Sequence, residues 1–452
     1  PGIGEPFGSG CDYDSFSDEL SHRSNLLIYS NIGRSPHLYK RLLREKGAER
    51  VKQRIELLRE FQALGIQFSV RPNGQLYSNF HLEYDPVYKK ETASLWESKL
   101  DTTIRSRPWL VRNHHTDMLE TFVQDVSGRA YLVSNTGEVL WKKQLEGPIM
   151  SKVRQVDKYQ NGNLQLLFNT REKIHLLDRK GRYVEGFPIE LPEKATAPMA
   201  LFDYAGKKRR ILVPCMDHKI HYYGLGGKEI DGWGFEGTES KMVRPPQHIR
   251  IDKKDYILVT DSLGEVFLLT RRGKVRYEVE ERIGASEHTP LVIDEGRSIE
   301  KSRMVFTDTT GAVVKFRYDG KRARTHLKEE MQKPYFFAYE DLETDGKKDM
   351  LLLEGNELAV FGADEEQRFG YTFDSTITDP PMVFRFSEGK GKVGVVDRKS
   401  KKAYLFDRDG SLHSGMPLFG STRFSIGDIN RDGYQELVIG SKSGTLYCYS
   451  LK

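Results

Sequence analysis

A four-residue phrase, rich in apolar and aromatic side chains, recurs eight times along the chain. The spacing is regular, because 316 residues from Tyr131 to Tyr447 hold seven intervals of about 45 residues each. A period of about 45 residues is typical of a four-stranded propeller blade, and a single blade cannot bury both of its faces. The sequence therefore predicts a closed ring of sheets, with one copy of the phrase in each sheet: Ala130–Val133, Ile174–Leu177, Ile220–Tyr223, Val266–Leu269, Val313–Phe316, Leu358–Phe361, Ala403–Phe406 and Leu446–Tyr449.

The residues around each copy predict the other strands of a blade. Apolar runs such as Ile257–Val259 and Leu437–Ile439 precede the phrase, as expected of strands that are covered on both faces. A glycine follows most copies and supplies the positive φ of a hairpin turn; these residues are Gly137, Gly181, Gly227, Gly273, Gly320 and Gly410. The sixth repeat has Ala363–Glu366 there instead, and we expect a longer turn.

The two ends of the repeat region predict how the ring closes. The last phrase ends at Tyr449, so the final blade lacks a fourth strand. The segment Leu95–Leu100 precedes the first complete repeat and resembles Leu140–Leu145, the expected fourth strand of that repeat. An unpaired sheet edge is unfavourable, so we expect residues 94–101 to complete the last blade. Residues 94–452 are then an eight-bladed propeller of four-stranded blades, with seven blades as the alternative.

The first 90 residues do not follow the repeat. Residues 1–23, which begin without Met, are expected to be a flexible lead-in that remains after cleavage or truncation. Residues 24–90 predict a small α+β element. The predicted fold class is therefore an all-β propeller with a small α+β element at its N-terminal side. Its expected parts are a strand at Leu26–Tyr29, a helix through Leu38 and Leu43, a helix from Val51 to Phe61 that Gly65 ends, and a hairpin of Ile66–Val70 and Leu76–Tyr84.

Composition excludes several classes of function. The net charge is +5, from 70 basic and 65 acidic residues, which does not indicate a nucleic-acid-binding protein. No stretch reaches the ~18 continuous apolar residues of a membrane span. The chain has three cysteines (Cys11, Cys215 and Cys448), and their spacing indicates neither a disulfide framework nor a metal site.

The sharpest local motif is the ten-residue segment from Asp428 to Leu437. It places side-chain oxygens at positions 1, 3, 5 and 9 around a glycine turn, which suits a hard cation such as Ca²⁺. An EF-hand is excluded because position 12 is Ile439 instead of Glu. The predicted calcium ligands of first choice are Asp428, Asn430, Asp432 and Glu436, with the carbonyl of Tyr434.

A second loop repeats this pattern two blades earlier. Its candidate ligands are Asp341, Glu343, Asp345 and Asp349. A third copy begins at Asp157, but its aromatic third position and neutral ninth position argue against an ion there. The alternative interpretation of all three loops is that the aspartates cap turns through hydrogen bonds to the backbone, without metal.

These motifs carry a resemblance to known repeat classes. The form D-x-N-x-D-G-x-x-E-L-V-I-G, followed by G-T-L-Y, resembles the FG-GAP/VCBS class of propeller repeats. The Gly-Glu-Val-Leu-Trp turn at 137–141 resembles the PQQ-like class. The resemblance covers residues 94–452. It implies a β-propeller that acts in binding or scaffolding outside the cytoplasm, in the periplasm or at the cell surface, as outer-membrane assembly propellers do.

Two classes of function remain open. A quinone-dependent dehydrogenase is also an eight-bladed ring, but this chain has no vicinal cysteine pair and only four Trp residues. It also lacks G-x-S-x-G, H-E-x-x-H and Walker motifs. We therefore predict a non-enzymatic scaffold with no catalytic residues, which binds a protein partner or a surface ligand as a monomer or within a larger complex.

Three similar loops are candidates for a binding face. They are Gly186–Pro188, Gly232–Phe235 and Gly415–Leu418, and each is expected to follow an outer strand. They could pack an apolar residue between neighbouring blades, or they could form a ring of contacts for a partner.

Overall fold

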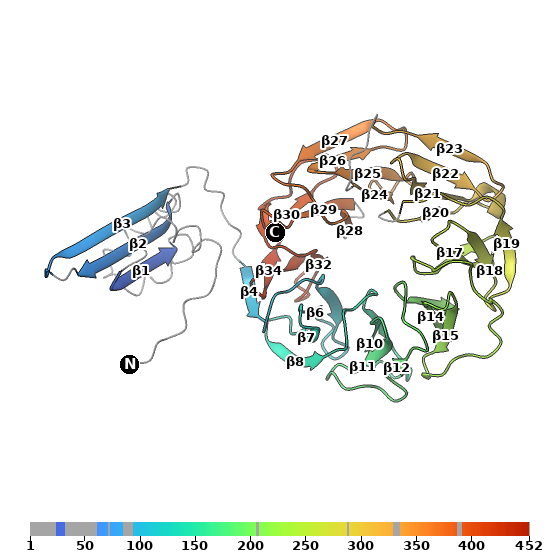
Figure 1. The fold of residues 1–452 in the computed structure, drawn as a ribbon, viewed down its shortest axis with the longest axis horizontal. Helices are drawn as coiled ribbons and strands as arrows, with labels where there is room; N and C mark the ends of the chain where they lie inside the picture. Colours follow the sequence, from blue (N-terminus) through green and yellow to red (C-terminus); the bar gives the residue numbers. More distant parts are fainter. Residues whose placement is uncertain are drawn as a thin grey trace. The chain divides into compact units, whose positions relative to one another are not determined.

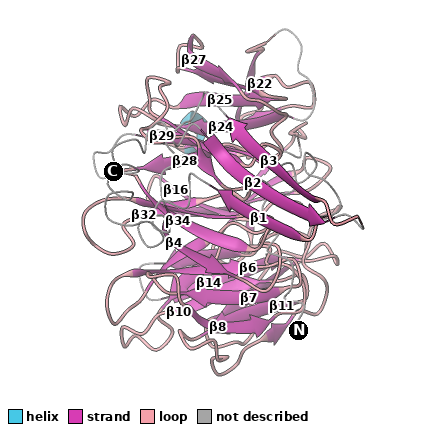
Figure 2. Ribbon diagram, turned by 90° about the vertical axis from the view of Figure 1, so that its left-hand side faces the viewer, coloured by secondary structure: helices cyan, strands magenta, loops and turns pink. Residues whose placement is uncertain are grey.

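The computed structural model describes residues 24–31, 61–70, 73–84, 94–204, 208–286, 289–328, 335–386 and 391–451. The chain divides into two compact units, Pro1–Glu91 and Thr92–Lys452. Nearly all regular structure in the described residues is β-strand, and the exception is the short 3₁₀ helix η1 (Ile299–Lys301) (Figure 2). Within these residues, no helix is long and apolar enough to cross a membrane.

The first unit contains a three-stranded antiparallel sheet in the order β1 (Leu26–Asn31), β2 (Phe61–Val70) and β3 (Leu76–Tyr84). The predicted hairpin of β2 and β3 is present. The prediction that Phe61 and Gly65 belong to the end of a helix is wrong, because β2 starts at Phe61 and Gly65 pairs with both Tyr29 and His81. Strand partners on both sides override the local helical pattern. The two predicted helices and residues 1–23 lie outside the described residues.

The described residues of the second unit form eight sheets, which we number as blades 1 to 8 in chain order (Figure 1). Each is an antiparallel meander. The strands of blades 1 to 4 are β5 (Trp109–Arg112), β6 (Leu119–Gln124), β7 (Arg129–Val133) and β8 (Val139–Gln144); β9 (Arg154–Val156), β10 (Gln165–Asn169), β11 (Lys173–Leu177) and β12 (Ile189–Glu190); β13 (Ala200–Tyr204), β14 (Lys208–Pro214) and β15 (Ile220–Gly224); and β16 (Gln247–Ile251), β17 (Lys254–Thr260), β18 (Val266–Leu269) and β19 (Val275–Val279).

Blades 5 to 8 continue the same order around the ring. Their strands are β20 (Val292–Asp294), β21 (Arg303–Thr307), β22 (Val313–Arg317) and β23 (Arg322–Thr325); β24 (Tyr335–Glu340), β25 (Asp349–Glu354), β26 (Glu357–Phe361) and β27 (Gln367–Thr372); β28 (Met382–Arg385), β29 (Gly391–Asp397), β30 (Lys402–Phe406) and β31 (Leu418–Phe419); and β32 (Ser425–Gly427), β33 (Glu436–Gly440) and β34 (Thr445–Ser450), to which β4 (Ser94–Lys99) is added.

The strand β4 closes the ring. It pairs antiparallel with β34, so that Cys448 lies opposite Trp96 and Leu446 opposite Ser98. The segment that we expected to complete the last blade therefore supplies its fourth strand. Figure 1 shows first strands such as β24 and β28 nearest the axis of the ring, and fourth strands such as β23 and β27 at its rim.

The core of the ring lies between neighbouring blades. In the described part of the ring, the buried apolar residues form eight clusters, and each cluster joins two consecutive blades. At the point of closure, Tyr131 and Val133 of blade 1 pack with Val438 and Cys448 of blade 8. Full burial of such side chains stabilises a fold by about 1.5–3 kcal/mol each, so the ring depends on every blade contact being made.

Aromatic residues of the fourth strands also connect neighbouring blades. A Cβ atom added to Gly137 would lie 3.0 Å from the ring of Trp96, and one added to Gly181 would lie 2.8 Å from Trp141. Both glycines have positive φ. Phe369 on Gly410 repeats this contact from a fourth strand, and Trp233 on Gly273 repeats it from the loop that follows the third strand of blade 3. Glycine is therefore required twice at these turns, for its backbone conformation and for the close approach of the neighbouring ring.

Two expectations about individual blades are wrong. The turn of the sixth repeat, Gly362–Glu366, is as long as that of the first, and Glu365 adopts the positive φ that glycine adopts elsewhere. Blade 3 has three strands instead of four, with only an isolated bridge between Tyr223 and Glu229 at its outer edge.

Candidate functional site

The meander divides the loops of the ring between two ends. The loops between first and second strands, together with the turns between third and fourth strands, lie at one end, which we call the Asp-loop end. The turns between second and third strands, together with the connections to the next blade, lie at the other, which we call the connection end. All the predicted calcium ligands are in loops of the Asp-loop end or at the start of the strand that follows.

The three Asp loops share one set of hydrogen bonds. The carboxylate at position 1 accepts the N–H groups of positions 5 and 6, at 2.7–3.2 Å. The side-chain oxygen at position 5 accepts the N–H of position 7, at 2.8–3.0 Å. Position 4 has positive φ in each loop. Position 1 is Asp157, Asp341 or Asp428, and position 5 is Asn161, Asp345 or Asp432.

The ninth position ties each loop to the strand that follows. Its side-chain oxygen accepts the N–H of position 2 at 2.8 Å in Gln165, 3.0 Å in Asp349 and 2.8 Å in Glu436. In the Asp428 loop, Asn430 additionally accepts the N–H of Asp432 at 2.9 Å. The Asp157 loop forms the same contacts with neutral side chains at positions 5 and 9, so this turn structure does not require the full set of carboxylates.

Most of the predicted metal ligands accept backbone N–H groups within these turns. Among the described residues, no group of three His, Cys, Asp or Glu side chains is arranged to hold a metal ion. Glu343 turns to blade 7 and pairs with Arg408 at 2.8 Å. The pKa of Asp349 is raised, by burial first and by the charges of Glu343, Asp341 and Asp345 next. The Asp341 loop is thus a region of concentrated negative charge.

A charged cavity of about 410 Å³ lies beside the Asp341 loop. Turns of blades 6 and 7 complete its wall, and it contains charges of both signs. Asp364 pairs with Arg368 at 2.6 Å, next to the pair of Glu343 and Arg408. Such a cavity suits a polar or charged partner group more than an apolar ligand.

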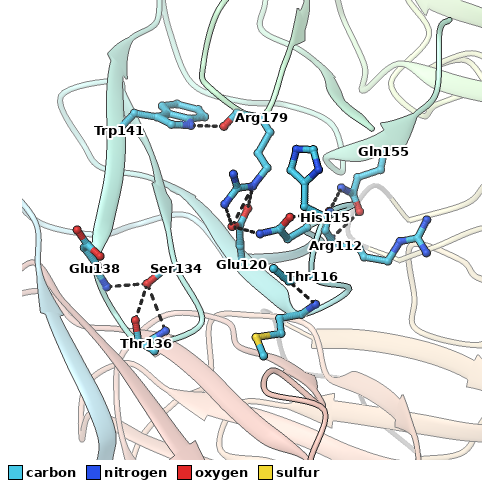
Figure 3. Close-up of polar contacts among 12 residues, drawn as sticks. Arg112, His115, Thr116, Glu120, Ser134, Thr136, Glu138, Trp141, Gln155 and Arg179 are labelled. Atoms are coloured by element: carbon cyan, nitrogen blue, oxygen red, sulfur yellow. Dashed lines mark hydrogen bonds and ion pairs between the residues drawn. The ribbon is translucent and has the colours of Figure 1, made fainter. Parts of the chain in front are cut away.

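Sequence reasoning missed a buried polar network between blades 1 and 2 (Figure 3). The carboxylate of Glu120 accepts the Nε–H of Arg179 at 3.0–3.1 Å and the side-chain N–H of Asn113 at 2.9 Å. The indole N–H of Trp141 donates to the carbonyl of Arg179 at 2.7 Å. Glu120 has the blade position of Asp349 and Glu436, so an alignment of the repeats was the signal that could have found it.

The three candidate binding loops pack against their own ring. Phe187 and Phe235 are buried, and Trp233 and Met416 pack against clusters of neighbouring blades. The expectation that these loops follow an outer strand is wrong. Gly186–Pro188 precedes the short strand β12, and Gly415–Leu418 runs into the short strand β31. Gly232–Phe235 lies in blade 3, which lacks a fourth strand. In these three blades, the loops occupy the outer edge, where the other blades have a longer fourth strand.

Comparisons with known proteins identify the fold. No protein-family model matches the sequence, and no curated protein matches it either. Among solved structures, Sqt1 from Saccharomyces cerevisiae has a TM-score of 0.53 at 11% identity, over 80% of this chain and 99% of that chain. The chain is also similar to BBS1N in a complex with ARL6DN (TM-score 0.46, 9% identity, 80% and 97% coverage) and to the Pan2 WD40 domain from Neurospora crassa (0.40, 11%, 80% and 95%).

The similarity to Sqt1, together with the ring of sheets, shows the fold class predicted from the sequence, an all-β protein with a β-propeller. At 11% identity, the similarity to Sqt1 shows the fold alone.

Proposed function

We propose that the ring is a non-enzymatic scaffold that binds a protein partner. The observation that carries this proposal is the charged cavity of about 410 Å³ at the Asp-loop end, which has acidic and basic groups within one wall. Paired charges of both signs at a surface favour a specific, oriented partner, because each wrong alignment brings like charges together. The hydrogen bonds of the Asp341 loop hold part of this wall in place, as a recognition surface requires.

The test is an affinity purification from the source organism with the full chain, compared with a charge-reversal variant of the cavity wall. Arg408→Glu places a carboxylate beside Glu343 and should abolish recovery of the specific partner. Lys442→Glu, in a turn at the connection end, is the matched control and should retain it. Recovery of the same partner by both variants would contradict a binding surface at the cavity.

We further propose that the repeats belong to the FG-GAP/VCBS and PQQ-like classes and that the ring acts outside the cytoplasm. The common hydrogen bonds of the three Asp loops support the first class, and the contact of Trp141 with the turn of Gly181 supports the second. Localisation of the full-length protein by cell fractionation tests the compartment.

We also propose Ca²⁺ as the ion of the Asp428 loop. Asp428, Asp432 and Glu436 provide three carboxylates, which is the hard oxygen chemistry that Ca²⁺ prefers. Each carboxylate already accepts N–H groups from the backbone. Each carboxylate has about four lone-pair sites, so acceptor capacity remains for an ion. Binding would require the side chains of the loop to turn toward one point.

A further inference from the structure

Three cations occupy the same position in three adjacent blades. In every blade, the third residue of the repeated phrase pairs with a residue of the second strand, and that residue pairs in turn with a residue of the first strand. We call the position two residues before this first-strand residue the entry position. The paired first-strand residues of blades 8, 1 and 2 are Ser425, Trp109 and Arg154. The entry positions of these blades are therefore Arg423, Arg107 and Lys152.

The other five blades have uncharged residues at the entry position. The same register assignment places proline there in blades 3, 4, 5 and 7, and phenylalanine in blade 6: Pro198, Pro245, Pro290, Pro380 and Phe336. Proline suits a connection that enters a strand at its edge. Three long cations in consecutive blades therefore depart from the pattern of this ring in one sector, at the start of the strands nearest the axis (Figure 1).

Arg107 reaches the strand that follows Arg423, and the charges of the three cations influence one another. The Nε–H of Arg107 donates to Oγ of Ser425 at 3.0 Å, two residues from Arg423. The guanidinium of Arg107 also lies 5.8 Å from the ring centre of Phe384, on the first strand of blade 7. Burial first, and the charge of Arg423 next, lower the pKa of Arg107 to about 10. Burial and then the charges of Arg154, Arg107 and Arg423 lower the pKa of Lys152.

Among the described residues, these three cations have few compensating charges. None of the three forms an ion pair with another described residue. The Nε atom of Arg423 is buried and lacks a hydrogen-bond partner within the described part of the chain. Two carboxylates counteract the lowering of these pKa values: Glu340 acts on Lys152 and Asp379 on Arg423. Asp379 is paired with Arg398 and Glu340 with Arg385.

We propose that Arg107, Lys152 and Arg423 form a binding site for an oxyanion, the phosphate or carboxylate group of a ligand, near the axis of the ring at the connection end. Like charges that are close together and partly removed from water repel one another, and an anion relieves this repulsion. Guanidinium groups offer several N–H donors in a plane, which match two oxygens of a phosphate or carboxylate. The site lies at the end opposite the Asp loops and does not depend on the proposed scaffold function.

Isothermal titration calorimetry on the full chain tests the proposal, with inorganic phosphate and citrate as probes and sodium chloride of equal ionic strength as the control. We expect phosphate or citrate to bind and to raise the unfolding temperature beyond the effect of chloride. A response to phosphate alone assigns a phosphoryl ligand, and a response to citrate alone assigns a carboxylate ligand. Equal responses to all three salts would overturn the proposal.

Variants locate the site. Arg423→Gln and Lys152→Gln should each weaken anion binding by at least about tenfold, because a hydrogen bond to a charged group contributes about 1.5–3 kcal/mol. Lys399→Gln, a cation in a turn of the same end, should leave the affinity unchanged. Lys152 is partly exposed, so its replacement should not prevent folding, and the loss of repulsion should raise the unfolding temperature without anion. Unchanged affinity in both variants would refute the site.

Discussion

The contact of Trp141 with Gly181 provides the most direct test of how the blades are joined. Replacement of Gly181 by alanine has two separable effects. The residue has φ of +76°, and the left-handed region costs a non-glycine residue about 1–2 kcal/mol. The added Cβ would also lie 2.8 Å from Cδ2 and 3.0 Å from Cε3 of Trp141. The indole cannot move aside easily, because its N–H donates to the carbonyl of Arg179 at 2.7 Å.

Overpacking of this kind typically costs about 1–3 kcal/mol. We therefore expect Gly181→Ala to lower the free energy of unfolding by about 2–5 kcal/mol, the sum of the two effects. Gly162→Ala is the matched control in the same blade, since Gly162 has φ of +85° and no atom within 4 Å of the added Cβ. It should cost only the backbone contribution, about 1–2 kcal/mol.

Urea unfolding followed by circular dichroism measures both variants against the unsubstituted chain. The difference between them isolates the contact between blades 1 and 2. Equal destabilisation by the two substitutions would refute the argument that Trp141 locks the neighbouring turn.

Four further predictions concern other parts of the ring. Deletion of residues 1–101 should lower the unfolding temperature relative to deletion of residues 1–91, because only the first removes β4; equal temperatures would contradict its closing role. Calcium at 100 times its dissociation constant should stabilise the fold by about 2.7 kcal/mol, and Asp432→Ala should remove most of this gain; a melting temperature indifferent to calcium and chelator leaves only the turn-capping interpretation. Arg179→Ala should destabilise the ring by about 3 kcal/mol in urea unfolding, because the Glu120 carboxylate is only 4% exposed and loses its guanidinium, and adding Glu120→Gln should recover part of the loss. The raised pKa of Asp349 disfavours its charged form in the fold, so Asp349→Asn should raise the unfolding temperature at neutral pH, and the gain should vanish as the pH falls through the folded and then the unfolded pKa; a gain that persists at low pH would exclude this cause.

The architecture of the ring could be predicted because its determinants are local and repeated. Each blade is a meander of neighbouring strands, so the period of the phrase indicates which segments pair. The segment from Ser94 was recognisable as a closing strand because the last repeat is one strand short and an open sheet edge is unfavourable. Local spacing also predicted the turns that begin at Asp157, Asp341 and Asp428, since their hydrogen bonds join residues at most seven positions apart.

Only the tertiary structure decided the features that depend on contacts between residues far apart in the sequence. Gly65 belongs to a strand because β1 and β3 pair on both sides of it, which no local pattern indicates. Glu120 and Arg179 are 59 residues apart and meet only because their blades are neighbours. Arg107 and Ser425 are 318 residues apart, and closure of the ring alone brings Arg107 and Arg423 into one sector. The period of the repeats determines the order of the sheets. The proximity of Arg107 and Arg423 near the axis depends instead on closure of the ring, which brings the two ends of the repeat region together.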